Sequence, residues 1–175
     1  AGFLTVSALQ RGSLPAGDVG RFTTLLLAGS MIGTLALGWV ADRAGHRLAI
    51  LAGMAAMVGA NLVALAAPSS SAFGAAFVLT GVHVAAVNVS NLNVMLEFAP
   101  APEERPTYIG LGTTSMAPVA LGAPLAAGLT ADAAGFVAVF AVAAVAGAGG
   151  LAVLLARVRD PRHARALTPA AEPGR

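Results

Sequence analysis

The chain has 175 residues, of which 57% are hydrophobic and only 10% carry a charge, and its formal net charge is +2. This composition is more apolar and far less charged than that of soluble domains, so it predicts residence in a membrane. The basic residues form no face with interleaved aromatic side chains, which argues against nucleic acid as a partner. The chain contains no cysteine, which excludes disulfides and thiolate chemistry.

Long uncharged segments divide the sequence into units of membrane length, since a spanning helix needs about 20 apolar residues. Residues 1–10 are too short to cross and are expected to be the end of a helix, followed by a loop at 11–21. The tail 157–175 is polar, contains proline and is expected to be disordered. The sequence therefore predicts an all-α integral membrane protein in a lipid bilayer with five spanning helices, at 22–41, 48–67, 72–97, 107–131 and 134–156.

All ten basic residues are arginines, and they are distributed unevenly between the two ends of the predicted spans. Arg11 and Arg21 lie on one side. The other arginines lie in the turn 38–47, the loop 98–106 and the tail. Because positively charged loops stay on the side of synthesis, the turn and the tail are expected to be cytoplasmic. The expected location is the plasma (inner) membrane.

The turn between the first two spans carries a spaced polar motif, Gly-x-x-x-Asp-Arg-x-Gly-x-Arg, formed by Gly38, Asp42, Arg43, Gly45 and Arg47. This motif resembles the signature loop of the major facilitator superfamily, which joins helices 2 and 3 and recurs in weaker form between helices 8 and 9. The match departs at His46, where the family more often has Arg or Lys. We refer to residues 38–47 as the signature turn.

The resemblance implies half of a twelve-helix transporter that moves a small solute by alternating access. The loop at 97–110 resembles the link between helices 10 and 11, so the spans are numbered 8 to 12, with residues 1–10 as the end of helix 7. The alternative numbering, helices 2 to 6 of the first half, stays open. The expected partner is the N-terminal half, without which this chain is not expected to transport. A membrane scaffold or receptor-like member without transport is the alternative function.

Polar side chains concentrate in the third span, where each one is costly in hydrocarbon and tends to face a cavity or another helix. At about 100° per residue, Thr80, His83, Ser90, Asn91 and Glu97 fall on one helix face. Asn88 flanks this face, and Thr114 lies in the next span. We expect Thr80, His83, Asn88, Ser90, Asn91 and Thr114 to line a path for a substrate or ion. The amides could instead hold helices together. His83 could carry a proton or serve only as a structural hydrogen-bonding group.

Glu97 lies at the same level of the membrane as the signature turn. It is expected to pair with Arg43 or Arg47, and the resemblance implies that such pairs stabilise one access state. The alternative is that Glu97 faces water. By resemblance, Asp42 is expected to meet a helix N-terminus in the other half. The sequence shows no Ser-His-Asp, metal-ligand or phosphate-binding pattern, so we expect no enzyme activity, no metal and no cofactor.

Overall fold

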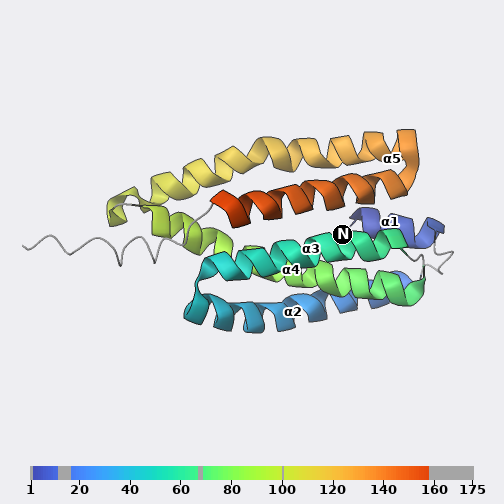
Figure 1. Cartoon of the computed structure of the whole chain (residues 1–175), viewed down its shortest axis with the longest axis horizontal. Helices are drawn as coiled ribbons and strands as arrows, with labels where there is room; N and C mark the ends of the chain where they lie inside the picture. Colours follow the sequence, from blue (N-terminus) through green and yellow to red (C-terminus); the bar gives the residue numbers. More distant parts are fainter. Residues whose placement is uncertain (1, 12–16, 67–68, 100, 158–175) are drawn as a thin grey trace, which may run out of the picture.

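The computed structural model describes all residues except 1, 12–16, 67–68, 100 and 158–175. The described residues form helices and no strand. Most of the helices run along the length of the molecule (Figure 1). The elements are α1 (Gly2–Arg11), α2 (Asp18–Ala44), α3 (His46–Ala66), α4 (Ser70–Phe98), the short 3₁₀ helix η1 (Pro102–Glu104) and α5 (Arg105–Arg157). The expected all-α fold is therefore confirmed, and the expected tail lies outside the described residues.

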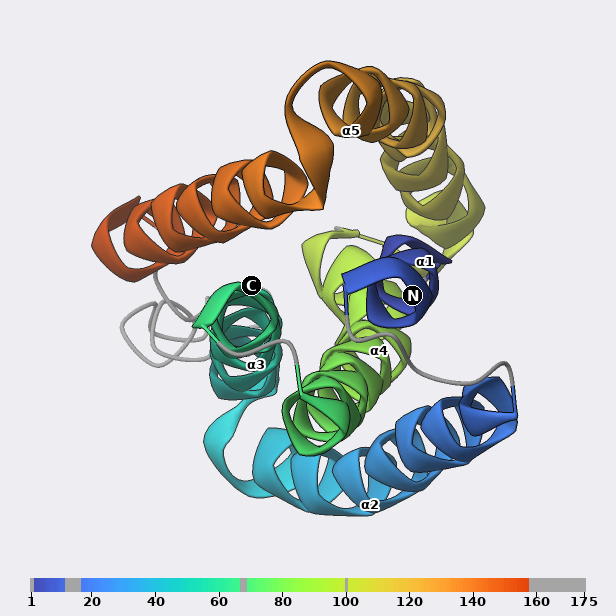
Figure 2. The ribbon, with the colours of Figure 1, turned by 90° about the vertical axis from the view of Figure 1, so that its right-hand side faces the viewer.

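Helix α5 is bent back on itself at Gly135, whose φ of 77° and ψ of 173° are not helical. A straight α-helix rises about 1.5 Å per residue, so α5 unbent would be far longer than the membrane is thick. The bend divides it into two segments that lie side by side (Figures 1 and 2). By length and composition, α2, α3, α4 and α5 can cross a membrane among the described residues, and the two segments of α5 correspond to the expected spans 107–131 and 134–156.

The four long helices all begin earlier than the apolar pattern indicates, and polar residues explain two of these starts. Helix α2 starts at Asp18, inside the expected loop 11–21, and an acidic residue in the first turn is favourable beside the positive end of a helix. Helix α4 starts at Ser70 because Ser69 caps it: the Ser69 hydroxyl accepts a hydrogen bond of 3.2 Å from the backbone N–H of Ala72. An acidic residue in the first turn of α2 and a serine cap on α4 favour helix beyond the apolar segments.

Helix α4 packs against both α2 and α3 and lies next to α1 (Figure 2). Glycines bring α2 and α4 together. A Cβ atom at Gly33 of α2 would lie 2.9 Å from the Cβ of Ala85, and one at Gly81 of α4 would lie 2.7 Å from the backbone nitrogen of Ser30. On the other side of α4, Ala86 fills the space beside Gly53 of α3. Such close approach is how membrane helices gain packing energy without a hydrophobic driving force.

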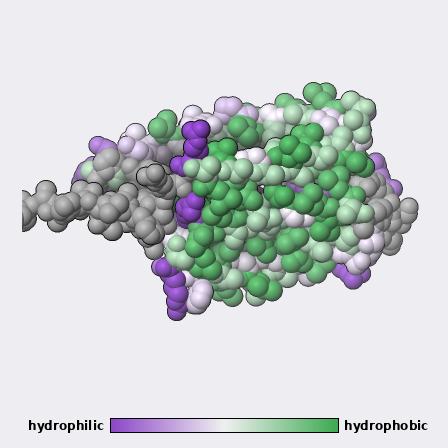
Figure 3. Space-filling view, in the orientation of Figure 1, coloured by the Kyte–Doolittle hydropathy of each residue, from purple (hydrophilic) through white to green (hydrophobic). Residues whose placement is uncertain are grey.

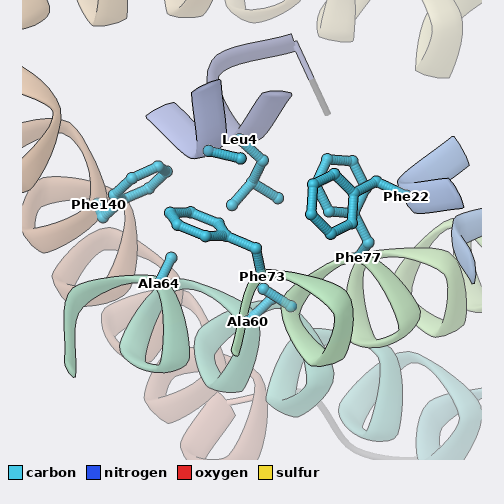
Figure 4. Packing of buried hydrophobic residues seen from close by; sticks show 9 residues of the cluster. Leu4, Phe22, Ala60, Ala64, Phe73, Phe77 and Phe140 are labelled. Carbon is cyan, nitrogen blue, oxygen red and sulfur yellow. The ribbon is translucent and has the colours of Figure 1, made fainter. Parts of the chain in front are cut away.

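Two buried clusters hold the bundle together. One lies around Phe73 and includes side chains from α1, α2, α3, α4 and the second segment of α5 (Figure 4). In it, Phe22 and Phe77 stack with ring centroids 5.1 Å apart. The other lies nearer the signature turn and consists of one leucine and four alanines: Leu37, Ala41, Ala49, Ala85 and Ala86. The small side chains of the second cluster let α2, α3 and α4 approach closely at this end.

The outer surface is apolar along the middle of the molecule and hydrophilic towards its ends (Figure 3). Large aliphatic side chains are exposed there, including Leu35 at 72% and Val145 at 74%. A soluble protein rarely exposes so continuous an apolar surface. The chain is therefore an integral membrane protein whose exposed band meets lipid or further helices.

Replacing Gly81 with alanine is expected to destabilise the bundle, because the added methyl group meets the backbone of α2 rather than a flexible side chain. Overpacking of this kind costs about 1–3 kcal/mol. Thermal unfolding of the detergent-solubilised chain measures the loss. Gly128→Ala is the matched control, since a Cβ there meets nothing within 4 Å and alanine favours the helix. Equal stability of the two variants would contradict the close α2–α4 packing.

Candidate functional site

The signature turn is built around Gly45. Its φ of 91° and ψ of 154° lie in a region that glycine adopts almost alone, and its N–H bonds to the Ala41 carbonyl at 3.0 Å. Gly45 thereby ends α2 and lets α3 begin at the next residue. This explains physically why the motif has glycine at this position.

Two arginines of the turn have contacts within the chain. The guanidinium of Arg43 lies over the ring of Trp39, 4.0 Å from its centroid, in cation–π geometry. Arg47 donates a hydrogen bond of 3.3 Å from Nη2 to the backbone carbonyl of Leu155, in the last turn of α5. The last carbonyls of a helix lack intrahelical partners and carry partial negative charge, so an arginine there is favourable. Arg47 thus joins the start of α3 to the end of α5.

The other motif residues lie on the surface. Asp42 is exposed in the last turn of α2. A Cβ at Gly38 would meet nothing within 4 Å, so the space beside this glycine is open in the chain. The side chain of Glu97 lies outside the described part of the structure, so its expected ion pair with Arg43 or Arg47 stays a prediction.

The polar face expected on α4 divides into a packed group and an open group. Thr80 is buried, and its hydroxyl donates to the Ala76 carbonyl of its own helix at 2.8 Å. Ser90 is wholly buried. Asn88 is exposed and Asn91 is half-buried. On the first segment of α5, Thr114 is exposed too.

His83 belongs to the packed group, because its imidazole contacts α3. Nδ1 lies 3.0 Å from the Gly53 carbonyl oxygen. A carbonyl only accepts, so Nδ1 carries the proton in this bond and Nε2 keeps its lone pair. Since Gly53 also receives Ala86 from α4, the His83 bond lies at the point where α3 and α4 are closest.

Sequence reasoning does not find the acceptors that His83 and Arg47 use. Both acceptors are backbone carbonyls, at Gly53 and Leu155. Every residue has a backbone carbonyl, so the amino-acid type does not indicate which one accepts. The only available clue is the glycine at position 53, which permits a neighbouring helix to reach the backbone.

An apolar groove of about 310 Å³ lies between the two segments of α5. Its single hydroxyl, on Thr130, donates to the Ala126 carbonyl at 2.7 Å. The groove therefore offers hydrocarbon contact and little directional bonding. Among the described residues, no group of three or more metal-ligating side chains is present. The groove is lined by Ala123, Ala126, Ala127, Thr130, Val139, Val142 and Ala143.

A helical membrane bundle with a Gly-Asp-Arg-Gly-Arg turn between its first two long helices has the features of one class of membrane transporter. The profile of the Major Facilitator Superfamily matches residues 4–174 of the chain. The chain therefore belongs to the major facilitator superfamily of membrane transporters. No curated protein and no solved structure shows a significant match to it.

Replacing Gly45 with alanine is expected to destabilise the signature turn by about 1–3 kcal/mol, because a Cβ strains the backbone at φ 91°. The matched control is Gly38→Ala in the same motif, where the added methyl group enters open space. Thermal unfolding in detergent compares the two. A Gly45 variant as stable as the Gly38 variant would show that the turn does not need its positive φ.

Proposed function

We propose that this chain forms the C-terminal half of a secondary active transporter, which moves a small solute by alternating access. In this assignment α1 is the end of helix 7, α2 to α4 are helices 8 to 10, and the two segments of α5 are helices 11 and 12. Family membership and the signature turn support the assignment. Rocking of this half against an N-terminal half would open a midplane site to either side of the membrane in turn.

The amides of α4 carry the proposal. Asn88 is exposed and Asn91 half-buried, although both lie within a helix that is otherwise the most enclosed of the bundle. An amide facing lipid loses hydrogen bonds with water and gains none. An open face with amides in a spanning helix is therefore best explained by a water-filled path along it. Val87, also exposed on α4, would give this path an apolar part.

The surface supports the N-terminal half as partner. Large apolar side chains are exposed along α2, and the space beside Gly38 at its end is open. The first segment of α5 is exposed on most of its circumference. A single helix in a bundle buries one face, so these helices have room for further neighbours. The exposed side chains include Leu27, Met31, Ile32 and Leu35 of α2 and Leu111, Val119, Leu121 and Leu125 of α5.

The membrane orientation follows from charge. We assign the signature turn and the tail to the cytoplasmic side of the plasma membrane, because both carry arginines and the opposite loop carries few. The exposed Asp42 would then meet a helix N-terminus of the other half at the cytoplasmic surface. Such a contact would stabilise the state in which the cytoplasmic ends are closed.

For His83 we assign a structural role rather than proton transport. Its bond to the Gly53 carbonyl fixes α3 against α4, and no Asp or Glu lies between Phe73 and Leu96 of α4. A proton carrier needs a neighbour that accepts the proton. A role of His83 in a proton-coupled cycle is the competing assignment.

Substitutions at His83 separate the two roles. Asparagine can present an N–H near the position of Nδ1, whereas leucine cannot. We expect His83→Leu to destabilise the chain by about 0.5–1.5 kcal/mol, since it removes the hydrogen bond between α4 and the Gly53 carbonyl of α3. His83→Asn should keep most of the stability, and in the whole transporter it should keep the pH dependence of uptake. Loss of that pH dependence in a stable His83→Asn variant would overturn the structural role.

Thiol labelling tests the path. The chain has no cysteine, so single cysteines can be placed at Asn88 and Asn91 in the whole transporter, with any other cysteines removed. Val145→Cys is the control, because Val145 is 74% exposed on the segment assigned to helix 12, far from any amide. We expect a membrane-impermeant, water-soluble thiol reagent to modify positions 88 and 91 and to spare 145.

Protection by solute then distinguishes transport from a scaffold. A transported solute should slow labelling at 88 or 91 and leave a cysteine in a loop unchanged. Absence of labelling at both positions in an inserted protein would contradict the water-filled path and favour the scaffold or receptor-like function. Labelling without protection by any solute in a broad panel would favour the same alternative.

A further inference from the structure

Two polar atoms near the signature turn are buried without a hydrogen-bond partner. They are the hydroxyl oxygen of Ser90 on α4 and Nδ1 of His46, the first residue of α3. Ser90 is wholly buried. Buried polar groups in native proteins almost always have a partner, and each exception needs an explanation. Most hydroxyls on these helices, such as that of Thr80, bond to their own helix, but that of Ser90 does not.

The alignment of α3 and α4 places these two residues at the same level along the helices. The helices are antiparallel neighbours, and His83 of α4 bonds to Gly53 of α3. Ser90 follows His83 by seven residues on α4, and His46 precedes Gly53 by seven residues on α3. Seven residues are two helical turns, or about 10 Å along the axis, so Ser90 and His46 lie at matching positions nearer the signature turn. Ala49, one turn from both Gly53 and His46, is also completely buried, so the contact between the helices continues over this distance.

The chemistry of the two groups is complementary. A neutral imidazole accepts at one ring nitrogen and donates at the other, and a serine hydroxyl both donates and accepts. The two atoms do not bond to each other directly in the structure. A single buried water can join them, since such waters bridge otherwise unpartnered buried atoms, and it can donate to Nδ1 or accept from it.

We propose that Ser90 and His46 form a pair, hydrogen-bonded through one buried water, that fastens α4 to the signature turn. The pair repeats, two turns further on, the link that His83 makes between the same helices. It also gives a reason for histidine at position 46 of the motif: the side chain serves the contact with α4 rather than the positive charge of the turn. Ser90 and His46 are positioning residues in this assignment.

The functional meaning of the pair rests on the proposed transport. Ser90 precedes Asn91, and these adjacent residues of α4 differ in burial: the Ser90 side chain is wholly buried, and the half-buried Asn91 amide belongs to the proposed path. A rotation or shift of α4 that follows solute binding at Asn91 would change the distance between Ser90 and His46. The pair therefore connects the proposed path to the signature turn through one helix.

A double-mutant cycle on the full chain in detergent tests the pair. Ser90→Ala and His46→Leu each leave the other group buried alone, so each should lower the midpoint of thermal unfolding by about 2–4 °C. The double variant should lose no more than the worse single variant, because both polar groups are then gone. His46→Asn should restore most of the loss, since its amide can bond to the bridging water. Additive losses in the double variant would overturn the pair.

Ser7 of α1 provides the matched control, because it is a second wholly buried serine whose hydroxyl lacks a partner. It lies in the other half of the bundle, beside the Phe73 cluster. Ser7→Ala combined with His46→Leu should give additive effects. If the Ser7/His46 combination shows a coupling energy as large as the Ser90/His46 combination, the cycle measures a general loss of packing in the bundle. That result would count against the pair.

A measurement on the unsubstituted chain keeps the proposal testable if a variant does not fold. The chain has three histidines, so the ring nitrogens of isotope-labelled histidine can be assigned by NMR. We expect a hydrogen-bond shift at His46 Nδ1 that Ser90→Ala removes and Ser7→Ala keeps. A ring nitrogen of His46 without a hydrogen bond would overturn the pair. Neither readout requires transport, so failure of the transport proposal and failure of the pair are distinguishable.

Discussion

The structure depends on a constraint that the membrane imposes: helices cannot gain stability there by hiding apolar surface from water, so they must approach closely enough for backbones to touch. Gly33 and Gly81 provide that approach between α2 and α4, and Gly53 provides it between α3 and α4. The position of α4 at the centre of the bundle follows from glycines on both of its neighbours. The hydrogen bond between His83 of α4 and Gly53 of α3 depends on this spacing.

Close packing explains where the polar side chains of α4 bond. His83 reaches a carbonyl of α3 because Gly53 leaves that carbonyl uncovered, and Ser90 becomes wholly buried because alanines surround the same junction. Amides that do not face α2 or α3 stay open, as at Asn88. The same helix therefore has a packed side and a more open side. The proposed transport would use the open side for water and solute and the packed side to hold the helix in place.

The signature turn connects three helices rather than two. Gly45 joins α2 to α3, and Arg47 extends to the end of α5 at Leu155. The Ser90–His46 pair would add α4 to this set. A short turn that contacts the ends of several helices holds these ends together, which is what the proposed rocking of one half as a unit would require. Backbone carbonyls and small residues take part in these contacts in the described structure.

The amino-acid sequence by itself determined the membrane class, the helical fold, the family and the need for glycine in the turn. These conclusions follow from the long uncharged segments, from the arginines between and after these segments, and from the spacing of Gly38, Asp42, Gly45 and Arg47. Only the tertiary structure decided which polar residues pack and which stay open. A helical wheel groups Ser90 with Asn91, but their burial differs because α2 and α3 cover two sides of α4 and leave another side less covered. Packing depends on which helix backbones come close to each other. The hydrogen-bond acceptors at these contacts are backbone carbonyls, which every residue has, so the residue type does not reveal them.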